Sequence, residues 1–93
     1  MQRTIARAEW PSFFESFTMQ HDHWMARVDG ERDSLPLEGI VAREDGRVTI
    51  TLGGDISHHR RIVIDAASVR VDESDLEIES TDKHVTRLTL RRP

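Results

Sequence analysis

Residues 10–17, WPSFFESF, contain four of the five aromatic residues in the chain. These four follow the i, i+3, i+4, i+7 spacing that places side chains on one face of an α-helix, and they are Trp10, Phe13, Phe14 and Phe17. Pro11 suits the first turn of such a helix, because the N–H that proline lacks has no intrahelical partner there. The spacing predicts a helix over residues 9–21 whose aromatic face forms a large part of the core.

The chain after this helix has the pattern of short strands. Apolar and polar residues alternate with a period of two, which is typical of strands with one buried face. Strand conformation is expected at residues 23–29, 37–44, 47–52, 60–65, 68–72, 76–80 and 84–91. No segment has the pattern of a helix that connects two parallel strands, so these strands are expected to follow one another in an antiparallel meander.

One hairpin is expected around Asp45-Gly46, because this dipeptide is preferred in two-residue type I′ turns. A turn of this length places Val41 opposite Ile50 on one face of the hairpin. Gly39 is then the natural position for a bend, since glycine adopts backbone conformations that other residues avoid.

A second hairpin is expected near the end of the chain. Its apolar faces match when Leu76 lies opposite Leu88. The same register sets Glu77 beside Arg87, so that opposite charges meet. This pairing requires an odd-length loop, of three or five residues, centred on Asp82.

These elements predict a single α+β domain over residues 1–93, with an N-terminal amphipathic helix packed on a strongly bent antiparallel meander of about six strands. The order of elements is similar to that of Sm-like and other SH3-like small barrels, in which a helix precedes bent strands. The pattern leaves open whether the sheet closes into a barrel or remains an open sheet.

The string I-x-R-x-E-W-P-x-F-F-x-x-F begins at Ile5, and L-P-L-E-G-I follows at residues 35–40. His59 precedes Ile62, and V-D stands at residues 71–72. With these strings the chain resembles a small prokaryotic family that is described only as a domain of unknown function. The resemblance implies a compact helix-plus-sheet domain and assigns no catalytic residue.

The composition excludes several classes of function. The chain has no cysteine, which rules out disulfides, thiolate metal sites and a cysteine nucleophile. Its 13 basic and 17 acidic residues give a formal net charge of -4, whereas nucleic-acid-binding domains are usually basic. No stretch approaches the roughly 20 apolar residues that span a bilayer, and residues 1–8 lack the apolar core of a signal peptide. We therefore expect a cytoplasmic protein that does not contact membranes.

Histidines and acidic residues gather at residues 21–23 and 55–59, and both clusters contain residue types that bind zinc, nickel or copper. The spacing fixes no third ligand in either cluster. A histidine near a helix C-terminus or in a polar loop also has a plain structural explanation. We therefore expect no metal and no other cofactor, and a metal-dependent enzyme or metal-binding protein is the second alternative function.

A cationic run precedes the strand expected at residues 60–65, and it consists of His58, His59, Arg60 and Arg61. Histidine gains charge near neutral pH, so the run is a candidate for anion binding, with a solvated loop edge as the structural alternative. These four are the binding residues that the sequence suggests. No nucleophile elbow or glycine-rich phosphate loop is present, and no catalytic residue is predicted.

Together these patterns predict a non-enzymatic binding or protein-interaction module, with a protein as one possible partner. Trp10 and Trp24 are expected to anchor the helix against the sheet, with the aromatic face in the core rather than at an interface. Open strand edges and a small core favour self-association, most simply as a homodimer. The first alternative function is a nucleic-acid-binding small barrel of the Sm-like type, which the acidic balance disfavours.

Overall fold

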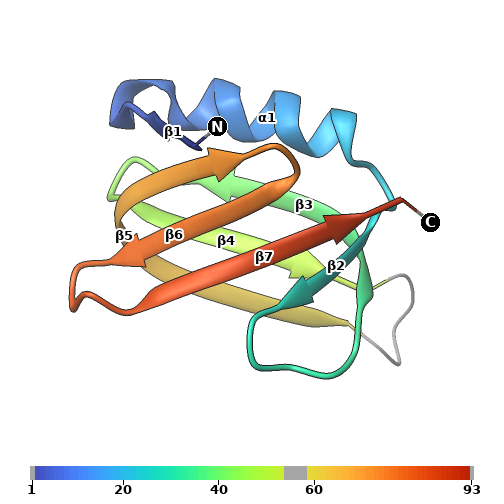
Figure 1. Cartoon of the computed structure of the whole chain (residues 1–93). Helices are drawn as coiled ribbons and strands as arrows, with labels where there is room; N and C mark the ends of the chain where they lie inside the picture. Colours follow the sequence, from blue (N-terminus) through green and yellow to red (C-terminus); the bar gives the residue numbers. More distant parts are fainter. Residues whose placement is uncertain (1, 54–58, 93) are drawn as a thin grey trace.

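The computed structural model describes residues 2–53 and 59–92. The elements in chain order are β1 (Gln2–Ile5), a short 3-10 helix (Arg7–Glu9), α1 (Trp10–Gln20), β2 (Met25–Val28), β3 (Leu35–Ala42), β4 (Arg47–Leu52), β5 (Arg60–Asp72), β6 (Asp75–Ser80) and β7 (Val85–Arg91). Figure 1 shows α1 lying across the top of the strands, with β1 beside its N-terminal end. No helix in the described part of the chain is long and apolar enough to cross a membrane.

The strands close into a small β-barrel. The strands β5, β4, β3, β2, β7 and β6 are hydrogen-bonded in that order, and β6 pairs again with β5. All of these pairings are antiparallel. The seventh strand, β1, lies outside this circuit and pairs with the C-terminal half of β5. The predicted α+β fold of a helix on a bent antiparallel sheet is confirmed, and closure answers the question that the sequence left open.

The two halves of strand β5 pair with different strands of the barrel. Its first half, residues 60–65, pairs with β4, and its second half pairs with β6 and β1. The prediction of two separate strands at residues 60–65 and 68–72 is therefore wrong. A β-bulge between Ala66 and Ser68 bends the strand without ending it, because a bulge adds one residue and increases the local twist.

The aromatic face of α1 closes the barrel core. Phe14 is fully buried, and Trp10 and Phe17 are almost so. The indole Nε1 of Trp10 donates a hydrogen bond to the carbonyl oxygen of Ile5, at 3.0 Å, and so ties the helix to β1. Phe13 is partly buried, and its ring centroid lies 5.4 Å from that of Phe14 in an edge-to-face arrangement.

The β3–β4 hairpin differs from the predicted one by one residue. Ile40, rather than Val41, lies opposite Ile50. The loop therefore has three residues: the N–H of Gly46 donates to the carbonyl oxygen of Arg43, and Gly46 has a φ of 92°. The observed register places Ile40 and Ile50 together in the core and leaves Val41 outside, so burial overrides the turn preference of the dipeptide.

The β6–β7 hairpin has the predicted register. Leu76 lies opposite Leu88, and Glu77 lies opposite Arg87. The loop comprises residues 81–83 and is centred on Asp82, since the N–H of Ser80 still pairs with the carbonyl of the residue after the loop. This prediction is confirmed because only one register matches both the apolar face and the charged face.

We expect replacement of Phe14 by alanine to lower the free energy of unfolding by about 3–5 kcal/mol, because it removes a fully buried ring and leaves a cavity. Denaturant unfolding measures the change. Met19→Ala is the matched control on the same helix, because Met19 is 74% exposed, and it should change stability by less than about 0.5 kcal/mol. Equal stabilities of the two variants would contradict the assigned core.

The pKa of Asp82 is expected to lie below its ordinary value of 3.8, because the Ser80 hydroxyl and then the His84 backbone N–H donate hydrogen bonds to its carboxylate. The ionised carboxylate therefore stabilises the hairpin above the unfolded-state pKa, and this contribution is lost as pH falls through the lower folded-state value. NMR titration of the carboxyl carbon measures the pKa, and Asp82→Asn should lack this part of the pH dependence. Titration of Asp82 above 3.8 would contradict the described loop.

Candidate functional site

The described part of the cationic run does not form an unneutralised patch. His58 lies outside the described residues. Nδ1 of His59 lies 3.5 Å from a carboxylate oxygen of Glu38, and Arg60 is ion-paired with a glutamate in the β2–β3 connection. Arg61 is exposed on the outer face of β5. Anion binding by the whole run stays a prediction, and Arg61 is the described member that has no ion-pair partner among the described residues.

One of the two histidines of the first predicted cluster has a structural role, whereas the other, His23, is exposed and lies 3.1 Å from a carboxylate oxygen of Asp22. His21 is buried, and its Nδ1 donates a hydrogen bond to the carbonyl oxygen of Phe17 at 2.7 Å. Its ring lies against that of Phe17 with the two planes tilted by 31°, and it meets the Trp24 ring edge-on, with centroid distances of 4.2 and 4.6 Å. Within residues 2–53 and 59–92, no three potential metal ligands come together. Through its contact with His21, Trp24 packs against the C-terminal end of α1, which is the position expected for an anchor of the helix.

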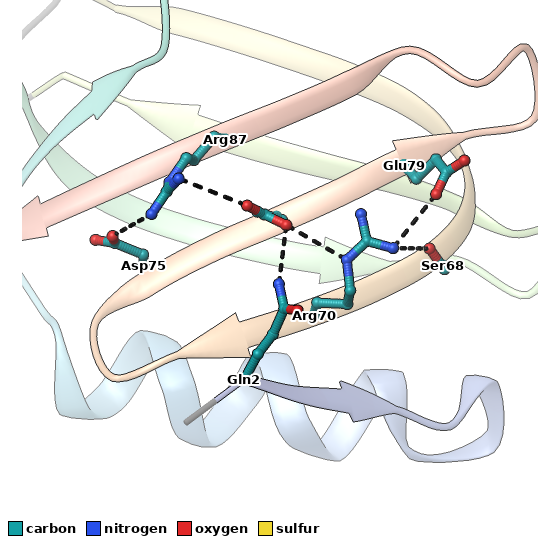
Figure 2. A network of polar contacts seen from close by, with 7 residues as sticks. Gln2, Ser68, Arg70, Asp75, Glu79 and Arg87 are labelled. Atoms are coloured by element: carbon teal, nitrogen blue, oxygen red, sulfur yellow. Dashed lines mark hydrogen bonds and ion pairs between the residues drawn. The ribbon is translucent and has the colours of Figure 1, made fainter.

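A network of polar side chains covers the outer face of β5, β6 and β7, and it consists of Gln2, Ser68, Arg70, Asp75, Glu77, Glu79 and Arg87 (Figure 2). Arg70 lies between Glu77 and Glu79, 3.3 Å from an oxygen of each carboxylate. The Gln2 amide also donates to Glu77, which fastens β1 across β5 to β6. Each charged group in the network has an opposite partner, so it links strands rather than presenting a charge for a ligand.

One edge of β3 is left without a strand partner in the described chain. β2 pairs with β3 only around residues 35–37, and β4 occupies the other edge. The N–H of Arg43 donates to the carbonyl oxygen of Arg47 at 2.8 Å, so this pair bonds toward β4. Because successive residues of an antiparallel strand point their backbone groups to opposite sides, the N–H and C=O groups of Ile40 and Ala42 point away from β4.

A groove runs between this strand edge and α1. Its volume is about 440 Å³, which lies within the usual range of ligand sites. The helix contributes Pro11, Glu15, Thr18 and Met19, and the strand contributes residues 39–42. Met19 and Val41, which are 74% and 59% exposed, are the most exposed of the large apolar side chains that the structure describes. An apolar groove therefore lies beside backbone groups that lack a strand partner.

The groove continues past the end of β3. A second hollow, of about 290 Å³, shares Pro11 and Ala42 with the first and is also lined by Arg7, Arg43 and Glu44. The N-terminal end of α1 thus lies near Ala42, and the helix runs antiparallel to β3 (Figure 1). The two hollows form one extended depression, which we call the α1–β3 groove.

This groove was not predicted from the sequence. Its signal was the run of three apolar residues at 40–42, which makes both faces of a strand apolar. A covering helix accounted for that pattern equally well. Met19 was a second signal, because it lies off the aromatic stripe and has no place in the core.

Comparison of the chain with protein-family models, with curated proteins and with solved structures finds no match. Membership of the domain family that the sequence resembles therefore stays a prediction. The fold and the site define the class directly: a small closed β-barrel with an N-terminal helix and an open strand edge beside an apolar groove.

We expect Ala42→Pro to be tolerated better than Val41→Pro. The N–H of Ala42 points to the open edge, so proline removes no ladder hydrogen bond there, whereas the N–H of Val41 bonds to β4. The free energy of unfolding of Val41→Pro should be lower by at least about 1 kcal/mol, the net worth of one hydrogen bond. Denaturant unfolding of both variants measures the difference, and the reverse order of stability would contradict the open edge.

Proposed function

We propose that the protein is a non-enzymatic interaction module that binds an extended segment of a partner polypeptide. The segment adds to β3 as a further strand and places its side chains in the α1–β3 groove. The single observation that carries this proposal is the juxtaposition of the outward-facing backbone groups of Ile40 and Ala42 with an apolar groove.

The strand edge favours a polypeptide over other ligands. An extended peptide can satisfy N–H and C=O groups at alternate residues with its own backbone, and the neighbouring groove then selects its side chains. A nucleic acid calls for an excess of positive charge, whereas the chain has a formal net charge of -4, and Arg60, Arg70 and Arg87 are ion-paired with carboxylates. These features support a protein partner rather than the Sm-like alternative.

The groove lining supports binding rather than chemistry. Its side chains are mainly apolar, and its polar members between α1 and β3 are Glu15 and Thr18. A hydroxyl nucleophile needs an adjacent general base, and no histidine or lysine lines this groove among the described residues. The two carboxyl groups of the groove, Glu15 and Glu44, line separate hollows, so they do not form a paired acid and base.

A partner chain fits this edge better than a second copy. Two copies paired antiparallel through both outward-facing residues would set Ile40 opposite Ala42 of the second copy. That register also brings Glu38 to Glu44 of the second copy, the first residue of the loop after β3, twice across the two-fold axis. Like charges directly opposite one another destabilise a strand pair. Homodimerisation, which the sequence predicts, is therefore opposed along β3.

Selection from a random-peptide display library against the immobilised protein tests the proposal. We expect enriched peptides whose affinity falls at least about tenfold for Met19→Lys, because the lysine places a charge in the apolar groove. Val85→Lys is the matched control, since Val85 is an exposed apolar residue on β7. Ala42→Pro should also abolish binding, because it removes a donor from the open edge.

Two results would overturn the proposal. One is the absence of enriched peptides, or equal binding of the enriched peptides to wild type, Met19→Lys and Ala42→Pro. The other is a concentration-dependent dimer in sedimentation that Ala42→Pro abolishes, which would assign the β3 edge to a second copy. A monomer across concentrations, together with the expected peptide selectivity, supports a partner chain.

A further inference from the structure

The α1–β3 groove is electrically polarised along its length. Two arginines, Arg7 and Arg43, line its end near Ala42. Neither is ion-paired with any residue that the structure describes. Glu44 lies at the same end and offsets one of the two charges, whereas Glu15 is the charged residue that lines the groove beside Met19. The lining is therefore net positive at the end near Ala42, and its negative charge away from that end is Glu15, which lies between Pro11 and Met19 on α1.

The positive end is held in place by aromatic packing. The guanidinium carbon of Arg7 lies 5.7 Å from the ring centroid of Trp10, which is a cation–π contact. Trp10 is itself fixed by burial and by its hydrogen bond to β1. Gly46 leaves room for this arrangement, because a Cβ atom there would lie 2.8 Å from a terminal nitrogen of Arg7. Less side-chain entropy is thus lost when Arg7 binds a carboxylate.

The dipole of α1 has the same direction as the charged side chains. The N-terminal end of the helix, where the macrodipole is positive, lies at the end of the groove that holds Arg7 and Arg43. The C-terminal end, where the macrodipole is negative, lies on the side of Met19. The electric field of the helix dipole and that of the charged side chains therefore act on a bound segment in the same direction.

We propose that the bound segment runs antiparallel to β3 and carries acidic residues at its N-terminal end and apolar residues at alternating positions after them. Antiparallel pairing is the more stable arrangement, and it brings the N-terminal end of the segment to Arg7 and Arg43. Its carboxylates form charge-assisted hydrogen bonds with the two guanidinium groups. This inference rests on the proposed function, since it specifies the orientation and chemistry of the same ligand.

Synthetic peptides with blocked ends test the inference. One carries Glu-Glu before a Val-Thr-Val-Thr-Val core, a second carries Glu-Glu after the same core, and a third carries Lys-Lys before it. We expect the first peptide to bind at least about tenfold more tightly than either of the others at low salt. This preference should shrink as salt rises, because exposed charges are screened.

A charge-reversal variant tests whether Arg43 causes the preference for N-terminal acidic residues. Arg43→Glu should weaken binding of the first peptide at least about tenfold and strengthen binding of the Lys-Lys peptide. Arg27→Glu is the matched control, because it changes the net charge equally from an exposed position on β2. Both arginines are exposed, so neither change is expected to unfold the protein.

The outcomes separate this inference from the function on which it rests. Equal binding of the three peptides to wild type, with loss of binding in Ala42→Pro, would overturn the charge preference and leave strand addition standing. Tighter binding of the peptide with C-terminal Glu-Glu would overturn the antiparallel orientation. Absence of binding by all three peptides, together with no enriched library peptides, would overturn both proposals.

Discussion

The structure depends on burial of the aromatic face of α1 in the barrel. A chain of this size has a small core, and Phe14, Phe17 and Trp10 supply its largest buried side chains on the helix. These rings hold α1 over the strands, and the hydrogen bond from Trp10 to Ile5 fixes the adjoining β1. Burial of the aromatic face therefore sets the position of α1. It also sets the position of the groove, which lies along the part of α1 that carries Met19.

Barrel closure and the helix together leave β3 incompletely paired. β5 is long enough to pair with β4 on one side of its bulge and with β6 on the other, so the circuit closes without a full β2–β3 ladder. α1 lies beside the part of β3 that β2 does not reach. Side chains of the helix fill the core beneath this edge. The helical backbone, however, cannot pair with the N–H and C=O groups of Ile40 and Ala42 as a strand would. A binding edge is thus a consequence of how this barrel closes.

The sequence predicted those features that a local pattern determines. The helix and the β6–β7 register were correct because aromatic spacing, and the match of Leu76 with Leu88, each admit one solution. The β3–β4 register was wrong by one residue because burial of Ile40 with Ile50 outweighs the preference of a dipeptide. Neither β1 nor the groove could be predicted, since both depend on contacts between distant segments.

Amide hydrogen exchange of β3 in the unliganded protein tests directly whether β3 presents an open edge beside α1. With an open edge, the amide hydrogens of Ile40 and Ala42 exchange much faster than those of Val41 and Arg43, which bond to β4. Equal and strong protection of all four would mean that the edge is already satisfied. That result would show that β3 has no open edge and would remove the basis for strand addition.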